Sequence, residues 1–361
     1  MELQHYLRTK GLAELTQEYK IKVNRHGEID NLVCLKYSQL ESPMGEIIVQ
    51  QCRGIILDEA NNWEIVSYPY DKFFNYGSGH APQLDWNTAQ LYEKLDGSLM
   101  TLYYYQGKWR VSSSGMADAA GEVNGFGYTF SELFWKVWQD KKYQLPRETN
   151  CCFMFELMTP YNRIVVRQNN NNLVLHGVRD RLTLAESEPQ LWSNKYGWET
   201  VETYPLQTLA EIIELTSKLD PMESEGYIVC DEKFNRIKIK SPNYVAIAHL
   251  KKDFSSRKIL EIVATNEGEE FLNYYPQWQE PYDRVKTKYK DLVKAIEAEY
   301  QQHQEIVEQK DFAMAVKHLP YSGILFNLRN GKTQTVKESL AQTSIQKLES
   351  LLFLATEENN I

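Results

Sequence analysis

The stretch Glu93-Lys94-Leu95-Asp96-Gly97-Ser98 is the most informative part of the chain. It contains the pattern Lys-x-Asp-Gly and stands directly before Leu99–Tyr105, an apolar and aromatic run typical of a β-strand. Alone the pattern is weak, because a chain of this length and average composition contains it by chance in roughly one case in ten. Whether Lys94 is a solvated turn residue or a reactive group therefore depends on the surrounding sequence.

Charged motifs stand on both sides of this stretch. Upstream are Arg53-Gly54 and Lys72-Phe73-Phe74-Asn75, and downstream are Phe153–Glu156, Glu225–Val229 and Lys238–Ser241. On the strand expected at 236–240, the side chains of Lys238 and Lys240 project to the same face. Two ammonium groups on one face repel each other unless an anion lies between them, and a nucleotide phosphate is such an anion. The alternative is a solvated edge strand with surface lysines.

This ordered set resembles the covalent nucleotidyltransferase superfamily of polynucleotide ligases and RNA capping enzymes. Within it, the chain is most similar to the RNA ligase 1 family of the T-even phage type. The specific points are Cys52-Arg53-Gly54-Ile55, Lys72-Phe73-Phe74-Asn75, Lys94–Leu99, Asn162-Arg163-Ile164-Val165, and Lys240 followed four residues later by Tyr244. The resemblance covers about residues 30–250.

One segment departs from the family pattern. Where the family often carries a lysine shortly after the Lys94 motif, this chain has Ser112-Ser113-Ser114-Gly115. A phosphate or metal contact is therefore expected to be missing or replaced at this segment.

The resemblance implies a role for each motif residue. Lys94 is the expected nucleophile that becomes linked to AMP, Asp96 positions its loop, and Gly97 permits a close backbone approach. ATP contacts are implied for Tyr37, Arg53, Lys72, Glu156, Glu225, Lys238 and Lys240. Tyr244 is expected to bind RNA or to support the site. Glu156, Glu225 and Glu270 are the implied ligands of Mg²⁺, with Mn²⁺ as an alternative; for Glu270 an acidic surface is the competing interpretation.

The implied activity is ATP-dependent joining of RNA. The expected substrates are RNA ends with a 5′-phosphate and a 3′-hydroxyl, broken tRNA among them, and the expected role is RNA repair. Nothing in the sequence indicates an obligate protein partner. Two alternatives remain open: a DNA ligase or GTP-using capping enzyme, and a catalytically idle RNA-binding protein on the same fold. DNA ligases and capping enzymes usually carry an OB-fold module after the final lysine motif. At that place this chain shows helical patterns.

The residue types suit nucleotidyl transfer in physical terms. A lysine amine attacks phosphorus only when it is neutral, and at an ordinary pKa near 10.4 only about one in a thousand is neutral at pH 7. Neighbouring cations and partial burial lower the pKa of such an amine. Arg53, Lys72, Lys238 and Lys240 are the candidates to supply those charges.

Composition excludes several other classes of protein. The chain has 361 residues and a net charge of −9, which disfavours a protein coated in positive potential for general nucleic-acid binding. Its five cysteines lack Cys-x-x-Cys spacing, which disfavours a disulfide framework and a zinc ribbon. No apolar run is long enough to cross a membrane, and the N-terminus lacks a secretory pattern. A cytoplasmic protein of a bacterium or a phage-infected host cell is expected.

The order of secondary-structure signals predicts two domains. Residues 1–250 are expected to form an α+β nucleotidyltransferase domain with antiparallel sheets around a nucleotide cleft. Residues 251–361 are expected to form an all-α domain that selects the RNA substrate; they hold 15 basic and 17 acidic residues. Predicted strands are 47–49, 53–57, 99–105, 109–111, 151–157, 173–178, 226–230 and 236–240. Predicted helices are 129–140, 206–219, 282–307 and 335–354.

Overall fold

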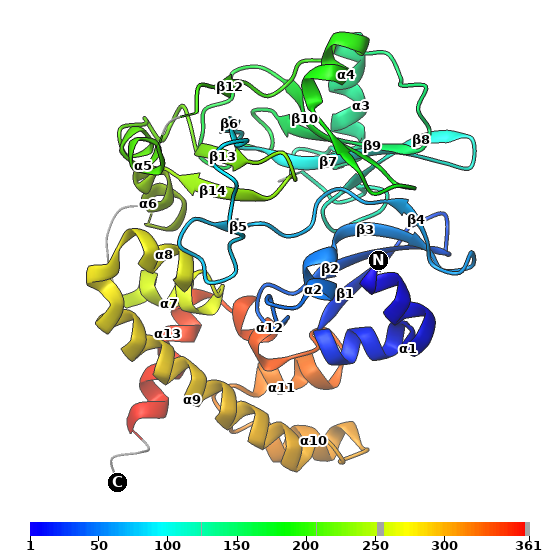
Figure 1. Cartoon of the computed structure of the whole chain (residues 1–361). Helices are drawn as coiled ribbons and strands as arrows, with labels where there is room; N and C mark the ends of the chain where they lie inside the picture. Colours follow the sequence, from blue (N-terminus) through cyan, green and yellow to red (C-terminus); the bar gives the residue numbers. More distant parts are fainter. Residues whose placement is uncertain (124, 207, 251–255, 358–361) are drawn as a thin grey trace. The chain divides into compact units, whose positions relative to one another are not determined.

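The computed structural model describes residues 1–123, 125–206, 208–250 and 256–357. The chain divides into two compact units, Met1–Ala248 and His249–Ile361. All strands of the described residues lie in the first unit, and the second is helical (Figure 1). The predicted α+β class with a helical C-terminal region is therefore confirmed. Residues 251–255, which follow the predicted domain boundary, lie outside the described ranges.

Three sheets build the first unit. The first has the order β1-β2-β3-β4, the second β11-β10-β9-β7-β8 and the third β12-β6-β13-β14-β5. Neighbouring strands are antiparallel except for β14 and β5, which run parallel. The first sheet comprises β1 (Ile21–Arg25), β2 (Leu32–Tyr37), β3 (Arg53–Asp58) and β4 (Glu64–Ser67). The second comprises β7 (Ser98–Tyr105), β8 (Lys108–Ser113), β9 (Cys151–Met158), β10 (Asn172–Asp180) and β11 (Glu186–Ser187). The third comprises β5 (Phe74–Asn75), β6 (Gln90–Lys94), β12 (Thr203–Tyr204), β13 (Gly226–Cys230) and β14 (Arg236–Lys240).

Helices cover the outer faces of these sheets. Core clusters join α1 to the first sheet, α3 to the second and α5 to the third. A further cluster lies between the first and second sheets. The helices that carry residues of this unit are α1 (Glu2–Tyr19), α2 (Ile47–Gln51), α3 (Phe130–Asp140), α4 (Pro189–Tyr196), α5 (Leu209–Ser217) and α6 (Pro242–Leu250).

Side-chain alternation in the central strands follows the prediction. In β9, Phe153 and Phe155 belong to the core under α3, whereas Met154 packs toward the first sheet. In β14, Ile237 and Ile239 pack with Ile212 of α5. This leaves Lys238, Lys240 and Glu156 on the faces that the second and third sheets turn toward each other.

One strand predicted in the first unit is wrong, and several elements of this unit were not predicted. Residues 47–49, predicted as a strand from their β-branched side chains, form the short helix α2, in which only Val49 is buried. No strand of the described residues pairs with that run, so its β-propensity is overridden. Helix α1 was among those not predicted, because its helical period is interrupted at Gly11, where φ is +85°.

All five cysteines are buried, reduced thiols of the first unit. They are Cys34, Cys52, Cys151, Cys152 and Cys230. Among the described residues, no helix is both long and apolar enough to span a bilayer.

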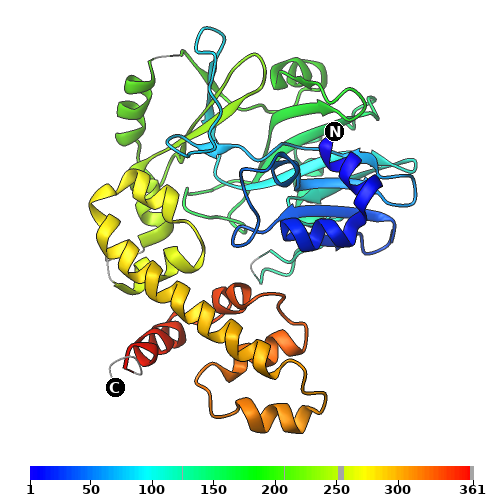
Figure 2. The same cartoon turned by 60° about the horizontal axis from the view of Figure 1, so that its bottom comes forward.

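The second unit is built around the long helix α9, which Figure 2 shows along most of its length. Its buried residues Tyr282, Tyr289, Leu292, Val293 and Ile296 recur at helical spacing. The helices of this unit are α7 (Ser256–Ala264), α8 (Gly268–Tyr274), the 3₁₀ turn η1 (Pro276–Trp278), α9 (Gln279–His303), α10 (Gln309–Val316), α11 (Ser322–Arg329), α12 (Val336–Ala341) and α13 (Ile345–Glu357).

Both predicted C-terminal helices differ from the structure in extent. The first ends at His303 rather than reaching Val307, which is 86% exposed, and Arg329 donates hydrogen bonds to the carbonyl oxygens of Ile306 and Val307. The second, predicted as 335–354, is two helices, α12 and α13, separated at residues 342–344.

Candidate active site

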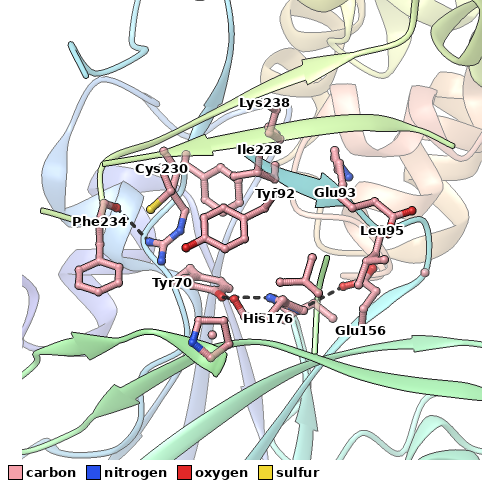
Figure 3. A pocket seen from close by; sticks show the side chains of 18 of the residues that line it. Tyr70, Tyr92, Glu93, Leu95, Glu156, His176, Ile228, Cys230, Phe234 and Lys238 are labelled. Carbon is pink, nitrogen blue, oxygen red and sulfur yellow. Dashed lines mark hydrogen bonds and ion pairs between the residues drawn. The ribbon is translucent and has the colours of Figure 1, made fainter. Parts of the chain in front are cut away.

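A cavity of about 300 Å³ lies between the second and third sheets. Figure 3 shows side chains from both sheets converging on it, with Tyr92 and Ile228 on one side and His176 and Glu156 on the other. Its polar lining includes Arg53, Tyr70, Tyr92, Lys94, Glu156, His176, Arg236, Lys238 and Lys240. The structure therefore gathers most of the charged residues singled out in the sequence around one space.

Lys94 lies at the end of β6 and contacts Glu225. Its Nζ atom is 2.6 Å from Oε2 of Glu225, and Nζ of Lys240 is 3.4 Å from the other oxygen. The Glu225 side chain is only 5% exposed. One buried carboxylate thus holds two lysines, one from each strand that flanks β13.

Two glycines allow the backbone to close around these groups. At Gly226, φ is +144°, and a Cβ atom would lie 2.2 Å from the carbonyl oxygen of Ile239. A Cβ atom on Gly97 would lie 2.5 Å from the carbonyl oxygen of Leu157. A side chain at Gly226 would push β13 away from β14, and a side chain at Gly97 would push the Lys94 loop away from β9.

Asp96 anchors the loop that follows Lys94. One carboxylate oxygen accepts hydrogen bonds from the backbone N–H groups of Val165 (2.9 Å) and Val166 (2.7 Å). The other accepts the hydroxyl of Tyr244 at 2.8 Å. Asp96 and Tyr244 are each 4% exposed. The Tyr244 side chain is thus buried, and it contacts the loop through Asp96.

The three cations of β14 differ in their partners. Arg236 pairs with Glu186 at 2.6 Å, and Lys240 shares Glu225 with Lys94. Lys238 has no carboxylate within ion-pair distance among the described residues. Burial, followed by the charges of Lys240 and Lys94, holds the pKa of Lys238 well below its ordinary value.

Glu156 faces the cavity from β9. Its Oε2 atom lies 3.4 Å from Nε2 of His176 on β10. The other ring nitrogen of His176 is 3.0 Å from the hydroxyl of Tyr70, and the two rings are stacked (Figure 3). The carboxylate is therefore held at the wall of the cavity next to an aromatic surface.

Arg53, Tyr37 and Lys72 form a group at the border of the first sheet. The Arg53 guanidinium lies 4.7 Å from the ring centre of Phe73, which lines the cavity. Nζ of Lys72 is 3.3 Å from the hydroxyl of Tyr37. Burial raises the pKa of Tyr37, but Lys72 and Arg53 outweigh it and leave that pKa lowered. Nearby positive charge thus favours an anion here.

Residues 51–244 match a protein-family model described as RNA ligase. The chain belongs to the RNA ligase family. The matched range contains the Lys94 motif, both glutamates and the lysines of β14. This RNA ligase is therefore an enzyme of the phage T4 RNA ligase 1 type, as the motifs predicted.

Individual relatives of the ligase are distant. It is 25% identical to an RNA ligase of Rhodothermus phage RM378, over 84% of this chain and 86% of that protein. It is 24% identical to a putative bifunctional polynucleotide kinase/RNA ligase of Autographa californica nuclear polyhedrosis virus, over 97% of this chain but only 53% of that protein. A solved archaeal ATP-dependent RNA ligase aligns with a TM-score of 0.47 and 11% identity, over 88% of this chain and 89% of that one.

The acidic residues of the ligase differ in their suitability for a metal ion. Glu156 offers oxygens toward the cavity, which suits Mg²⁺, an ion that binds through one or two carboxylates, water and substrate phosphates. Both Glu225 oxygens are engaged by lysines. Within the described ranges, no group of three or more acidic, His or Cys residues is arranged to hold a metal. Glu270 lies in α8 of the second unit, and its metal role remains a prediction.

Several residues that organise the site were not predicted from the sequence. Asn162 is buried and donates to the Ser98 hydroxyl (2.9 Å) and the Leu157 carbonyl (2.7 Å), which joins the Lys94 loop to the end of β9. The quoted motif Asn162–Val165 contained this residue without indicating its task. For His176 and Tyr70, no pattern in the sequence pointed to the cavity.

Proposed function

We propose that this RNA ligase uses ATP to join an RNA 3′-hydroxyl to an RNA 5′-phosphate through a lysyl–AMP and an RNA–adenylate intermediate. The observation that carries the proposal is Lys94 beside Glu225 at the wall of a cavity lined by Arg53, Lys238 and Lys240. The cavity volume of about 300 Å³ lies at the lower end of the range for small-ligand sites.

In the first step, Nζ of Lys94 attacks the α-phosphorus of ATP. The N–P bond forms, and the P–O bond to pyrophosphate breaks. The proton must leave the amine before it can attack. Glu225, at 2.6 Å, is close enough to accept this proton. Lys238 and Lys240 are assigned to the phosphates, whose charge would offset the repulsion between neighbouring ammonium groups.

The second and third steps act on RNA. AMP passes from Lys94 to the oxygen of an RNA 5′-phosphate, and the 3′-hydroxyl of another end then attacks that phosphate and releases AMP. Mg²⁺, when bound, offsets negative charge on the transferring phosphoryl groups. Glu156 is the proposed residue for holding it. We assign broken tRNA as the natural substrate class and repair as the role.

Asp96 and Tyr244 are proposed as positioning residues. Their three hydrogen bonds fix the loop between Lys94 and β7, so that the amine meets the phosphate in one orientation. Neither is assigned a contact with the reacting atoms.

Labelled nucleotides test this proposal directly. Incubation with Mg²⁺ and α-³²P-ATP should leave label on the wild-type chain, whereas α-³²P-GTP should not. Lys94→Ala should form no adduct. Lys94→Arg should also fail, because arginine keeps the charge but does not lose its proton at usable pH.

Other outcomes would separate the alternatives. Transfer from GTP alone would indicate a capping enzyme, and absence of any adduct would indicate an idle RNA-binding protein. An adduct that persists in either Lys94 variant, with the variant folded by circular dichroism, would remove Lys94 as the nucleophile.

A further inference from the structure

Lys36 brings a positive charge to the serine segment that departs from the family pattern. It lies on β2, and its Nζ atom donates to Oγ of Ser114 at 3.0 Å. The side-chain stem of Lys36 packs against the same segment, since a Cβ atom on Gly115 would lie 3.3 Å from Cδ of Lys36. The ammonium group of Lys36 is therefore positioned where a lysine at residue 114 could also place one.

Lys36 pairs with Arg53 at an irregularity of the two strands, where the register of β2 and β3 shifts between Leu35 and Lys36. Besides burial, the positive charge of Arg53 helps to lower the pKa of Lys36, so the two like charges are close enough to destabilise each other. Nη1 of Arg53 is buried, and among the residues that the structure describes it has no hydrogen-bond partner. Two adjacent cations, one of them with an unsatisfied buried donor, indicate that an anion belongs between them.

Lys72 and Lys238 extend this group of cations. Lys238 and Arg53 lie against the same Phe73 ring, at 5.5 and 4.7 Å from its centre. We call Lys36, Arg53, Lys72 and Lys238 the cationic cluster. Within the described part of the chain, none of its members forms an ion pair with a carboxylate, whereas Lys94 and Lys240 share Glu225. Burial also lowers the pKa of Lys36, and Arg53 adds to the effect.

We propose that Lys36 binds the β- and γ-phosphates of ATP and holds pyrophosphate as it leaves, so that it replaces from β2 a lysine absent from the serine segment. This inference rests on the proposed adenylyl transfer to Lys94. In that step the attacking nitrogen and the leaving oxygen are roughly in line. Pyrophosphate must therefore depart on the side away from Lys94. Its several negative charges need cations there that no carboxylate of the protein already neutralises.

The same cations could instead receive the 5′-phosphate of RNA. The two ligands differ in the steps they serve, because pyrophosphate takes part only in the first step and its reversal. Sealing of RNA that already carries the adenylate involves no pyrophosphate. A residue that binds pyrophosphate can therefore be separated from one that binds RNA, and from one needed only for folding.

The test compares Lys36→Ala and Lys36→Met with the double variant Lys36→Ala/Ser114→Lys. In the double variant the ammonium group comes from residue 114, the residue that Lys36 contacts in the wild type. Lys108→Ala is the control, since Lys108 is an exposed lysine at the tip of the β7–β8 hairpin. Each protein is first loaded with AMP at saturating ATP. Inorganic pyrophosphate is then titrated, and the ATP that re-forms is measured. In parallel, each protein seals pre-adenylylated RNA.

We expect both single Lys36 variants to raise the half-saturating pyrophosphate concentration by about tenfold to a hundredfold, the loss typical of one charge-assisted hydrogen bond. Sealing of pre-adenylylated RNA should stay within about twofold of wild type. The double variant should recover most of the pyrophosphate affinity. Lys108→Ala should match wild type in both assays.

Three results would overturn the inference. One is unchanged pyrophosphate affinity in both single variants. Another is an equal loss in the sealing of pre-adenylylated RNA, which would indicate a structural role. The third is normal pyrophosphate affinity with slowed AMP transfer to a 5′-phosphorylated RNA, which would assign the cluster to RNA. If instead wild type forms no lysyl–AMP, it is the proposed function that fails.

Discussion

Lysines in the cavity differ in whether a carboxylate compensates their charge. Lys94 and Lys240 share Glu225, which is 5% exposed in its side chain, and this arrangement is satisfied without any ligand. Lys238 faces the same cavity without such a partner among the described residues. Lys238 is half-buried, and its lowered pKa indicates that the charged form costs free energy in the nucleotide-free enzyme, a cost that is offset when an anion binds.

Replacement of Lys238 by methionine should stabilise the free protein and impair its chemistry. Methionine fills a similar volume without a charge at this half-buried position, so we expect Lys238→Met to raise the free energy of unfolding by about 1 kcal/mol. Lysyl–AMP formation should fall by about tenfold or more, because a phosphate contact is lost. Urea unfolding and labelling with α-³²P-ATP measure the two effects.

The stability gain of this variant should depend on pH. The pKa of Lys238 is lowered in the folded state, so the unfolded chain binds more protons between that value and the ordinary one near 10.4. Wild-type stability therefore rises with pH across this window, and the advantage of Lys238→Met shrinks. A variant less stable than wild type at pH 7 would contradict the argument. Lys108→Met, at an exposed position, is the control.

The sequence allowed some residue positions to be predicted but not others. Alternation along β14 was enough to place Lys238 and Lys240 on one face, because a strand has a period of two. The partners of Asp96 were not accessible, because they are backbone N–H groups of Val165 and Val166 in a distant loop. Nothing in the type of a residue reveals that its backbone will bind a carboxylate.

At the scale of elements, the closeness of β13 and β14 determines where Glu225 lies. Gly226 pairs with Lys94 on one side and Lys240 on the other. Its φ of +144° and the 2.2 Å from a notional Cβ to the Ile239 carbonyl leave no room for a side chain. Glu225 can contact both Lys94 and Lys240 only because Gly226 has no side chain, which lets β6, β13 and β14 lie close together.

Gly226→Ala should therefore damage both stability and adenylylation. We expect a loss of about 2 kcal/mol or more in the free energy of unfolding, from backbone strain and the separation of β13 from β14. Lysyl–AMP formation should fall as well, since Glu225 moves with the strand. Gly79→Ala is the matched control, because a Cβ atom there meets nothing within 4 Å and φ is not positive. Equal stability of the two variants in thermal unfolding would contradict this account.

Elements with an unbroken pattern were predictable, and interrupted ones were not. The β7–β8 hairpin and α3 were found from alternation and from the helical period, and the structure gives them nearly the predicted limits. Helix α1 was missed because Gly11 breaks it into two segments. The strand predicted at 47–49 failed because propensity alone cannot supply a pairing partner.

At the scale of the whole molecule, the cavity is a feature of the first unit. Every described residue that lines it precedes Leu250 in the chain. The region 251–361 has 15 basic and 17 acidic residues, which is a poor basis for general attraction to RNA. A helical unit of this kind can instead recognise the shape of a folded RNA.

A chain that ends at residue 254 should therefore still form lysyl–AMP. We expect it to join simple single strands at a rate within about tenfold of the full chain, but to lose preference for a nicked, structured RNA. Competition between the two RNA substrates measures this preference. Insolubility of the truncated chain would mean that the helices chiefly cover an apolar face. An unchanged preference would eliminate the recognition role.

The buried thiols of the first unit make the enzyme well suited to fluorescence measurements. Burial raises the pKa of Cys34 and Cys151 to about 12 and that of Cys230 to about 11. Maleimide dyes react with exposed thiolates, so the native cysteines should stay unlabelled at neutral pH. One cysteine introduced on the surface of each unit could then carry a donor and an acceptor dye without removal of any natural residue. Energy transfer between the two dyes would follow the separation of the units as ATP and RNA bind.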